Sequence, residues 1–138
     1  MVVQPRLQRL HPNPRGSVKK ILVVDDSETI RLEVIRTLGQ AGFSVLEARD
    51  GAEGLATATK NPDLALVVLD VNMPVMNGLE MLERLRQNPT TADMPVLLMT
   101  TEAEDRLIER AKKAGAKGWF IKPVKPEMLL MATNKLAR

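Results

Sequence analysis

Five short apolar runs alternate along this chain with five segments of helical periodicity, and this alternation constrains the fold more than any other feature. Apolar residues fill most positions of each run, which is typical of strands that are buried on both faces in a parallel sheet. Such a sheet needs helices on both of its faces. The predicted strands are 19–24, 43–48, 64–69, 94–100 and 118–121, and the predicted helices are 28–40, 50–60, 79–87, 103–114 and 126 to nearly 138.

Capping and helix-stop residues agree with these boundaries. Ser27 is the predicted N-cap of the first helix, and Asp50 opens the second. Gly42 and Gly115 each follow the end of a predicted helix, where a glycine is favoured. Pro126 occupies a favoured first helical position and starts the last helix.

The first strand–helix turn decides between two parallel-sheet folds. Right-handed crossovers leave few topologies for five strand–helix units. A dinucleotide-binding sheet would carry GxGxxG at this turn, but residues 25–29 read DDSET. A glycine-rich or hydroxyl-rich phosphate loop for a flavin is also missing there. We therefore predict an α/β protein with the (βα)5 flavodoxin-like fold, a five-stranded parallel sheet of order 2-1-3-4-5 with helices on both faces.

The composition excludes several kinds of site. The chain has no cysteine, so disulfides, zinc–thiolate sites and thiol nucleophiles are excluded. Its single histidine, His11, lies in a proline-rich opening segment, which argues against a histidine metal site or a Ser-His-Asp triad. Catalysis would have to come from carboxylates, hydroxyls, lysines and a bound cation.

The positive charge is concentrated at the start of the chain. Residues 1–20 carry five basic residues and no acid, whereas the remainder carries 15 basic and 17 acidic residues. We predict a flexible basic arm over 1–18 and one domain over 19–138. The arm has no apolar stretch like that of a secretory signal, and no run approaches the roughly 20 apolar residues of a membrane span. We expect a cytoplasmic protein without membrane insertion, and no nucleic-acid partner, because the domain is acidic and aromatic residues are few.

Polar side chains follow four of the predicted strands. In such sheets the carboxyl ends of the strands meet at one edge, where ligands bind near the switch point between the first and third strands. A single polar residue at a strand end is usually a loop or cap residue, but several at this edge indicate a site. They are Asp25 and Asp26 after the first strand, Asp70 after the third, Thr100 and Thr101 after the fourth, and Lys122 after the fifth.

These residue types form a set suited to phosphoryl transfer. Three converging carboxylates repel one another unless a cation compensates, and oxygen ligands alone favour Mg²⁺, with Mn²⁺ or Ca²⁺ as alternatives. Lys122 can pair with a carboxylate or a phosphoryl group, and Thr100 offers a hydroxyl. Asp70 stands alone at the end of the most apolar strand and is the predicted nucleophile, whereas the adjacent Asp25 and Asp26 are better suited to a cation.

Four motifs resemble those of the receiver domains of bacterial two-component response regulators, and most closely the single-domain chemotaxis regulators. They are VVDDS at 23–27, VVLDVNMPVMNG at 67–78, LLMTTEAE at 97–104 and GWFIKP at 118–123. Their order and spacing make the resemblance specific, and it covers residues 19–138.

The resemblance implies a role for each residue around the predicted nucleophile. Asp70 would accept a phosphoryl group from a phosphohistidine on a sensor kinase. Asp26 would bind Mg²⁺ directly, Asp25 largely through water, and Asn72 through its backbone carbonyl. Lys122 would pair with the phosphoryl oxygens. Mn²⁺ is the alternative cation.

The resemblance also implies a conformational switch. Thr100 would move to hydrogen-bond the phosphoryl group, and Trp119 would then turn inward, although packing on an edge strand is the alternative explanation for this tryptophan. The bond from Lys122 to Pro123 is expected to be cis, which X-Pro bonds adopt at low cost. The surface of the last two strand–helix units would change as a result and control a protein partner.

Three neighbouring positions bear on turnover. Thr101 stands where the family most often has a small residue; its backbone N–H should still reach the phosphoryl group, but its bulk is expected to restrict access of water or small phosphodonors. Asn72 and Glu102 match positions that modulate dephosphorylation in the chemotaxis regulators.

Met73 and Pro74 are expected to stop the third strand. Gly78 is expected to give the backbone the freedom to turn into the next helix.

We therefore predict a phosphorylation-dependent signalling switch that catalyses only its own phosphoryl transfer and dephosphorylation. One expected partner is a sensor histidine kinase or phosphotransfer protein. The other is a downstream protein target, because the chain ends with the fifth helix and a DNA-binding output domain is not expected after it. A monomer is expected, or a dimer through the fourth-helix, fifth-strand, fifth-helix face on phosphorylation. The alternatives are a pseudo-receiver that never takes phosphate and an aspartate-nucleophile phosphatase of the haloacid dehalogenase class. The phosphatase would require an acidic residue, acting as general acid, at the position of Asn72.

Overall fold

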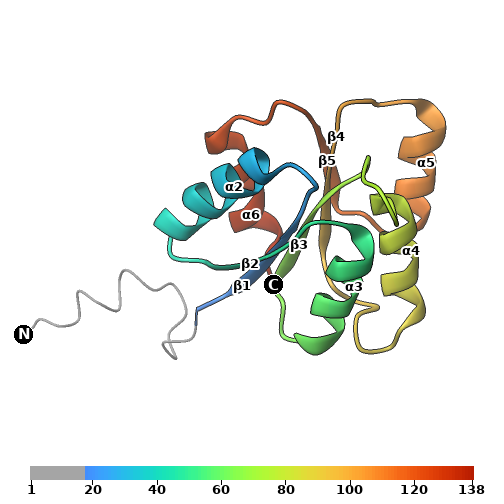
Figure 1. Ribbon diagram of the computed structural model, residues 1–138, viewed down its shortest axis with the longest axis horizontal. Coiled ribbons are helices and arrows are strands. Elements are labelled where there is room, and N and C mark those ends of the chain that lie inside the picture. The colour runs from blue at the N-terminus through green and yellow to red at the C-terminus, as the bar shows by residue number, and fades with distance from the viewer. Residues whose placement is uncertain (1–17) are drawn as a thin grey trace, which may run out of the picture.

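The computed structural model describes residues 18–138, so the predicted basic arm lies, apart from Val18, outside the described residues. Five parallel strands form one sheet of order β2-β1-β3-β4-β5, which confirms the predicted topology (Figure 1). Strands and helices alternate along the chain. They are β1 (Lys20–Val24), α2 (Glu28–Gln40), β2 (Ser44–Ala48), α3 (Gly51–Lys60), β3 (Leu66–Asp70), α4 (Gly78–Gln87), β4 (Val96–Thr100), α5 (Asp105–Lys113), β5 (Gly118–Ile121) and α6 (Pro126–Leu136).

Two strands begin two residues later than predicted, because the residues before them are used in turns. The backbone N–H of Leu64 donates to the carbonyl of Asn61, and that of Met94 donates to the carbonyl of Thr91. β3 therefore begins at Leu66 and includes Asp70, so that the predicted nucleophile is the last residue of the central strand.

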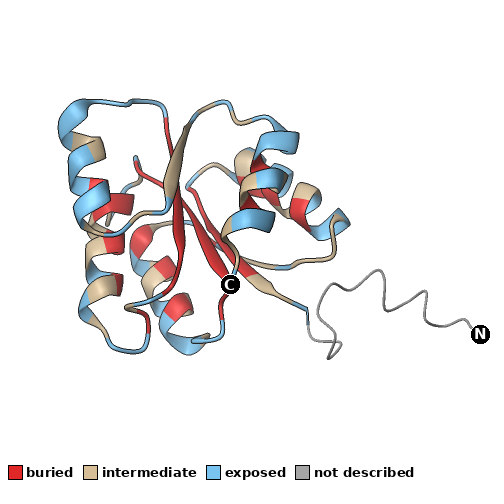
Figure 2. Cartoon of the chain, turned by 180° about the vertical axis from the view of Figure 1, so that it is seen from behind, coloured by how far each residue is buried: buried red, intermediate tan, exposed pale blue. Residues whose placement is uncertain are grey.

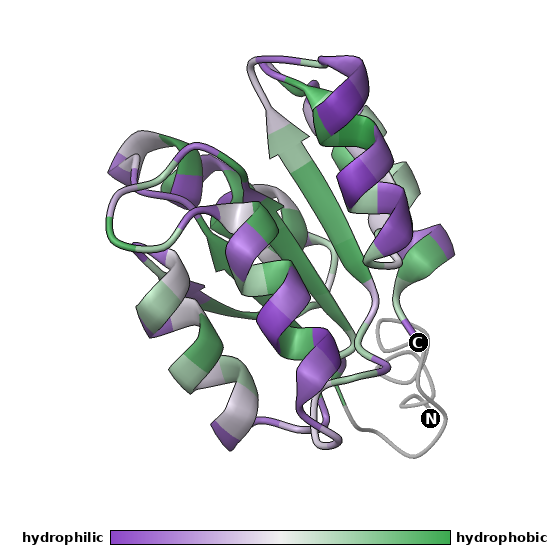
Figure 3. Ribbon diagram, turned by 90° about the vertical axis from the view of Figure 1, so that its right-hand side faces the viewer, coloured by the Kyte–Doolittle hydropathy of each residue, from purple (hydrophilic) through white to green (hydrophobic). Residues whose placement is uncertain are grey.

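The core lies on both faces of the sheet, which explains the continuous apolar runs. Successive residues of a strand point to opposite faces, and every residue of β3 and β4 is buried. Leu22, Val67 and Leu69 pack on the side covered by α3, α4 and α5, whereas Ile21 and Val68 pack on the side covered by α2 and α6. Figure 2 shows the buried strands at the centre of the molecule, and Figure 3 shows the hydrophilic residues on the outer faces of the helices.

Side-chain caps fix the starts of three helices. Ser27 accepts from the N–H of Ile30 and Asp50 from that of Glu53, as predicted, and Asn77 caps α4 in the same way. Within residues 18–138, no helix has the length and apolar character needed to cross a bilayer.

Gly78 serves a different purpose from the one expected. It is the first residue of α4, and its φ is not positive, so the turn does not depend on the conformational freedom of glycine. A Cβ atom at this position would instead overlap the backbone carbonyl of Asp70. The glycine therefore allows the start of α4 to approach the end of β3.

Candidate functional site

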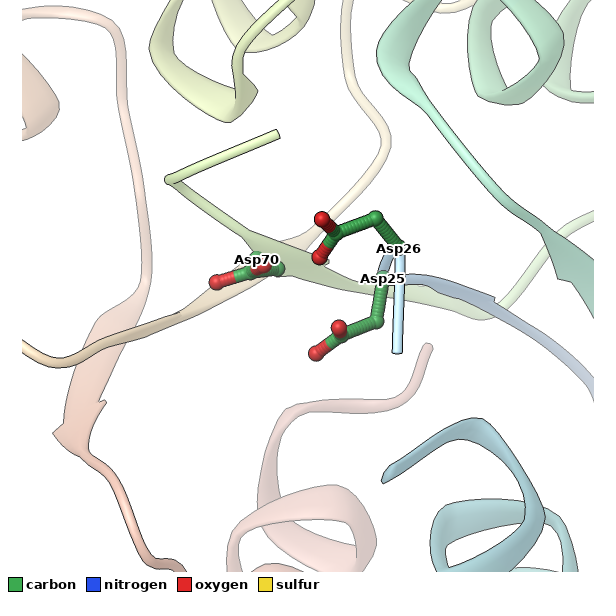
Figure 4. Close-up of side chains that lie close together, drawn as sticks. All are labelled: Asp25, Asp26 and Asp70. Carbon is green, nitrogen blue, oxygen red and sulfur yellow. The ribbon is translucent and has the colours of Figure 1, made fainter. Parts of the chain in front are cut away.

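Three carboxylates meet at the carboxyl edge of the sheet. Asp25 and Asp26 lie in the turn between β1 and α2, and Asp70 ends the neighbouring strand β3. One carboxylate oxygen of each lies within 4.8 Å of the others (Figure 4). Asp25 and Asp70 are buried, whereas Asp26 is exposed to solvent. The predicted convergence of these three residues is confirmed.

Lys122 supplies the positive charge at this edge. Its Nζ lies 2.8 Å from Oδ2 of Asp25 and 3.1 Å from Oδ1 of Asp70. Its backbone N–H donates to the carbonyl of Thr100 at 2.8 Å, which ties the residue after β5 to the end of β4. The peptide bond from Lys122 to Pro123 is cis, as predicted.

The buried position of Asp70 beside other charges alters its pKa. Burial raises the pKa of Asp70 most, the charge of Asp25 raises it as well, and the charge and hydrogen bond of Lys122 oppose both effects, so that the pKa is about 6. Burial alone would lower the pKa of Lys122, but its bonds and charge interactions with Asp25 and Asp70 outweigh this and raise it. Near pH 7, Asp70 is therefore mostly ionised beside a protonated lysine.

The donor set fits a hard divalent cation. It consists of carboxylate oxygens alone, which suit Mg²⁺, Mn²⁺ or Ca²⁺ and not the softer transition metals. An ion bound at about 2.1 Å to each of three oxygens needs them within about 4.2 Å of one another, close to the spacing of these three. Asp25, Asp26 and Asp70 could therefore hold Mg²⁺ with small side-chain adjustments.

The hydroxyl of Thr100 is engaged within its own loop. Thr100 is buried at the end of β4, and its Oγ1 donates to the carbonyl of Glu102 at 2.8 Å and accepts from the N–H of Glu102 at 3.0 Å. The side chain would have to leave these partners to reach a group on Asp70.

The side chains of Asn72 and Thr101 connect the two loops above the site. Nδ2 of Asn72 donates to Oγ1 of Thr101 at 3.3 Å, between the loop after β3 and the loop after β4. The side chain of Thr101 therefore lies beside Asn72, which follows Asp70 by two residues. The roles predicted for both residues and for Glu102 in turnover stay predictions.

Trp119 is half-buried and packs against the core cluster on the side of α3, α4 and α5. The Nζ of Lys112 lies 5.8 Å from the centre of its ring, within the range of a cation–π interaction. The packing expected of an edge-strand aromatic is thus present, and the inward turn of this residue stays a prediction.

Arg31 and Glu47 are not among the residues predicted from the sequence to serve the site. Arg31 is buried on the inner face of α2, and its Nη1 donates to the backbone carbonyl of Asp25 at 2.7 Å. Its Nε donates to Oε1 of Glu47 on β2 at 2.8 Å. The spacing of the sequence indicates this burial, because Arg31 precedes Val34 and Leu38 at the intervals of one helix face.

Val75, in the loop between β3 and α4, is held in a strained conformation. Its φ is +70°, rare for a β-branched residue, and the N–H of Met76 donates to the carbonyl of Pro74 at 2.7 Å across it, as in a γ-turn. Its side chain is 82% exposed and therefore contributes little burial.

We expect Val75→Gly to raise the free energy of unfolding by about 1 kcal/mol, because relief of strain exceeds the entropy that glycine adds to the unfolded chain. Urea unfolding measures the change. Val75→Ile keeps the β-branched strain and should leave stability unchanged. A glycine variant less stable than the wild type would contradict the strain.

Comparisons with known proteins agree with this geometry. The family model of the response regulator receiver domain matches residues 21–134. The chemotaxis protein CheY homolog of Campylobacter jejuni is 41% identical over 111 residues, which are 80% of this chain and 85% of that protein. CheY1 of Helicobacter pylori is 37% identical over 111 residues, which are 80% of this chain and 90% of that protein. The structure of chemotaxis protein CheY4 of Vibrio cholerae has a TM-score of 0.82 at 40% identity and covers 87% of this chain and 99% of that one. The chain belongs to the family of response regulator receiver domains.

Proposed function

We propose that this protein is a signalling switch that accepts a phosphoryl group on Asp70 from a sensor histidine kinase or a phosphotransfer protein, with Mg²⁺ as cofactor and Mn²⁺ as an alternative. One observation carries the proposal: the carboxylate of Asp70 converges with those of Asp25 and Asp26, and the ammonium group of Lys122 lies 3.1 Å from its Oδ1. Membership of the receiver family supports the same conclusion.

The chemistry requires one bond to form and one to break. An oxygen of ionised Asp70 attacks the phosphorus of a phosphohistidine, the P–N bond breaks, and the imidazole leaves with its electron pair, so that an acyl phosphate forms on Asp70. Lys122, already 3.1 Å from Oδ1 of Asp70, is placed to pair with the oxygens of the arriving group. When bound, Mg²⁺ supplies compensation for the negative charge that the carboxylates and the phosphoryl oxygens bring together.

We further propose that the added charge draws the Thr100 hydroxyl away from Glu102 and that Trp119 follows. Phosphorylation replaces the single negative charge of the Asp70 carboxylate by the nearly two charges of an acyl phosphate and brings three acceptor oxygens to the site, enough to bias a local two-state element. The exposed apolar side chains of Ile121, Met128 and Met131 on β5 and α6 offer a surface for a downstream protein. Dimerisation through the α5–β5–α6 face is the alternative outcome.

The test is phosphoryl uptake by the purified full chain. We expect incubation with Mg²⁺ and a small phosphodonor, or a phosphorylated kinase, to add the mass of one phosphoryl group, and EDTA to prevent the addition. In parallel, emission from Trp119, the single tryptophan in a chain without tyrosine, should change on addition of Mg²⁺ and beryllofluoride.

The two readouts separate the parts of the proposal. Absence of uptake from every donor would favour the pseudo-receiver, and unchanged emission during normal uptake would contradict the movement of Trp119. Steady release of phosphate from a small phosphomonoester would favour the phosphatase, although Asn72 stands where that class has its acid. We propose that the protein has no such turnover and acts only on its own phosphoryl group.

A further inference from the structure

Arg31 connects the turn that carries two of the carboxylates to the edge strand of the sheet. Its side chain is only 8% exposed and lies between two acceptors, the backbone carbonyl of Asp25 at 2.7 Å and the carboxylate of Glu47 at 2.8 Å. A guanidinium group holds two such acceptors in a fixed relative geometry, which an ammonium group cannot do. Arg31 therefore acts as a rigid connection between β2 and the turn after β1.

The carbonyl that Arg31 binds belongs to the peptide group that joins Asp25 to Asp26. The N–H of Asp25 is held by the carbonyl of Ala48 at 3.1 Å, and Oδ1 of Asp25 accepts from the N–H of Ser27 at 2.9 Å. The orientation of this peptide group sets the direction in which the Cα–Cβ bond of Asp26 leaves the backbone. Fixing the carbonyl thus constrains the relative placement of the two aspartates.

We propose that Arg31, held by Glu47, is a positioning residue that sets the Mg²⁺ affinity of the site through the peptide group between Asp25 and Asp26. The inference rests on the proposed function, because it concerns the same cation. Groups that orient metal ligands from outside the coordination sphere typically contribute 10- to 100-fold to metal affinity.

Electrostatics and positioning give opposite signs at Arg31, which makes the inference testable. Removing a positive charge near three carboxylates should by itself tighten the binding of a dication. Loss of the fixed peptide group should weaken it. The outcome for Arg31→Met therefore shows which effect dominates.

The experiment is calorimetric titration of the full chain with MgCl₂, without phosphodonor, on variants shown to be folded by circular dichroism and urea unfolding. We expect Arg31→Met to raise the Kd for Mg²⁺ about tenfold. Arg31→Lys should raise it less, because lysine can still hold one of the two acceptors. Arg36→Met removes a charge from the exposed face of the same helix and should leave the Kd unchanged or lower it. At saturating Mg²⁺, phosphoryl uptake by Arg31→Met should return to near the wild-type rate.

A Kd for Arg31→Met equal to or below that of Arg36→Met would overturn the inference while leaving the proposed function intact. Wild-type protein that binds no Mg²⁺ would overturn both. If Arg31→Met does not fold, Arg31→Lys decides the matter, because it conserves the charge; a two- to threefold rise in Kd, on the order of half the effect in free energy, is expected. An unchanged Kd for Arg31→Lys would then overturn the inference.

Discussion

Asp70→Asn is expected to abolish phosphoryl uptake and, at the same time, to make the metal-free protein more stable. The amide cannot act as the nucleophile, so the mass of one phosphoryl group should not be added under any condition in which the wild type takes it up. Asn has nearly the shape of Asp, and the substitution removes one of three crowded negative charges. Loss of function and gain of stability should therefore occur in the same variant.

The pH dependence of the stability gain follows from the raised pKa. Burial first, and then the charge of Asp25, raises the pKa of Asp70 from its ordinary value of 3.8 to about 6 in the folded protein. Because the folded state binds this proton more tightly than the unfolded state, ionisation of Asp70 destabilises the fold as the pH rises from about 4 to about 6, and the full penalty remains above that window. The Asp70→Asn variant lacks this destabilisation because its amide does not ionise.

We expect Asp70→Asn to unfold with a free energy about 1–2 kcal/mol higher than the wild type at pH 7.5 without Mg²⁺, and the difference to vanish near pH 4. Urea unfolding at several pH values measures it. Asp63→Asn is the matched control: Asp63 is exposed and paired with Lys20, its pKa is lowered by the hydrogen bond from that lysine, and its loss should not stabilise the protein. An Asp70→Asn variant that still takes up the phosphoryl group would place the acceptor elsewhere.

The fold could be predicted from the sequence because its strands and several of its helix starts have recognisable local residue patterns. Strands buried on both faces require continuous apolar runs, and β3 and β4 have them. Some helix starts carry a capping residue, and Ser27 and Asp50 are side-chain caps in the structure. The site could be predicted for a topological reason, since the order of a parallel sheet places the ends of β1 and β3 side by side before any contact is known.

The missing parts depend on contacts and loop conformations that the pattern of residue types does not show. The bond from Arg31 to Glu47 crosses from α2 to β2, and a buried arginine cannot be told from an exposed one by residue type. The hydroxyl of Thr100 could have faced Asp70 or its own loop, and only the conformation of residues 100–102 places it on Glu102. The starts of β3 and β4 were predicted too early because the apolar pattern does not show that Leu64 and Met94 close turns.

Gly78→Ala is expected to lower the free energy of unfolding by about 3 kcal/mol or more, although a single methyl group is added. The new Cβ would overlap the carbonyl of Asp70 and crowd the Cα of Val71. These are backbone atoms of the central strand and its exit, and the N–H of Gly78 already donates to the carbonyl of Val71 at 2.9 Å. The overlap cannot be relieved by rotating a side chain, so either α4 or the end of β3 must shift, and overpacking of this kind is strongly destabilising.

Gly39→Ala is the matched control for this substitution. Gly39 lies near the end of α2, is exposed, and has no atom within 4 Å of the position that a Cβ would take. Alanine should therefore stabilise the protein there by about 0.5–1 kcal/mol through its helix propensity. The two glycine-to-alanine changes should thus differ in sign in the same urea-unfolding experiment. Because the overlapped carbonyl belongs to Asp70 itself, any Gly78→Ala protein that folds should also take up the phosphoryl group more slowly than Gly39→Ala, and equal stabilities of the two variants would show that the approach of α4 to β3 is not tight.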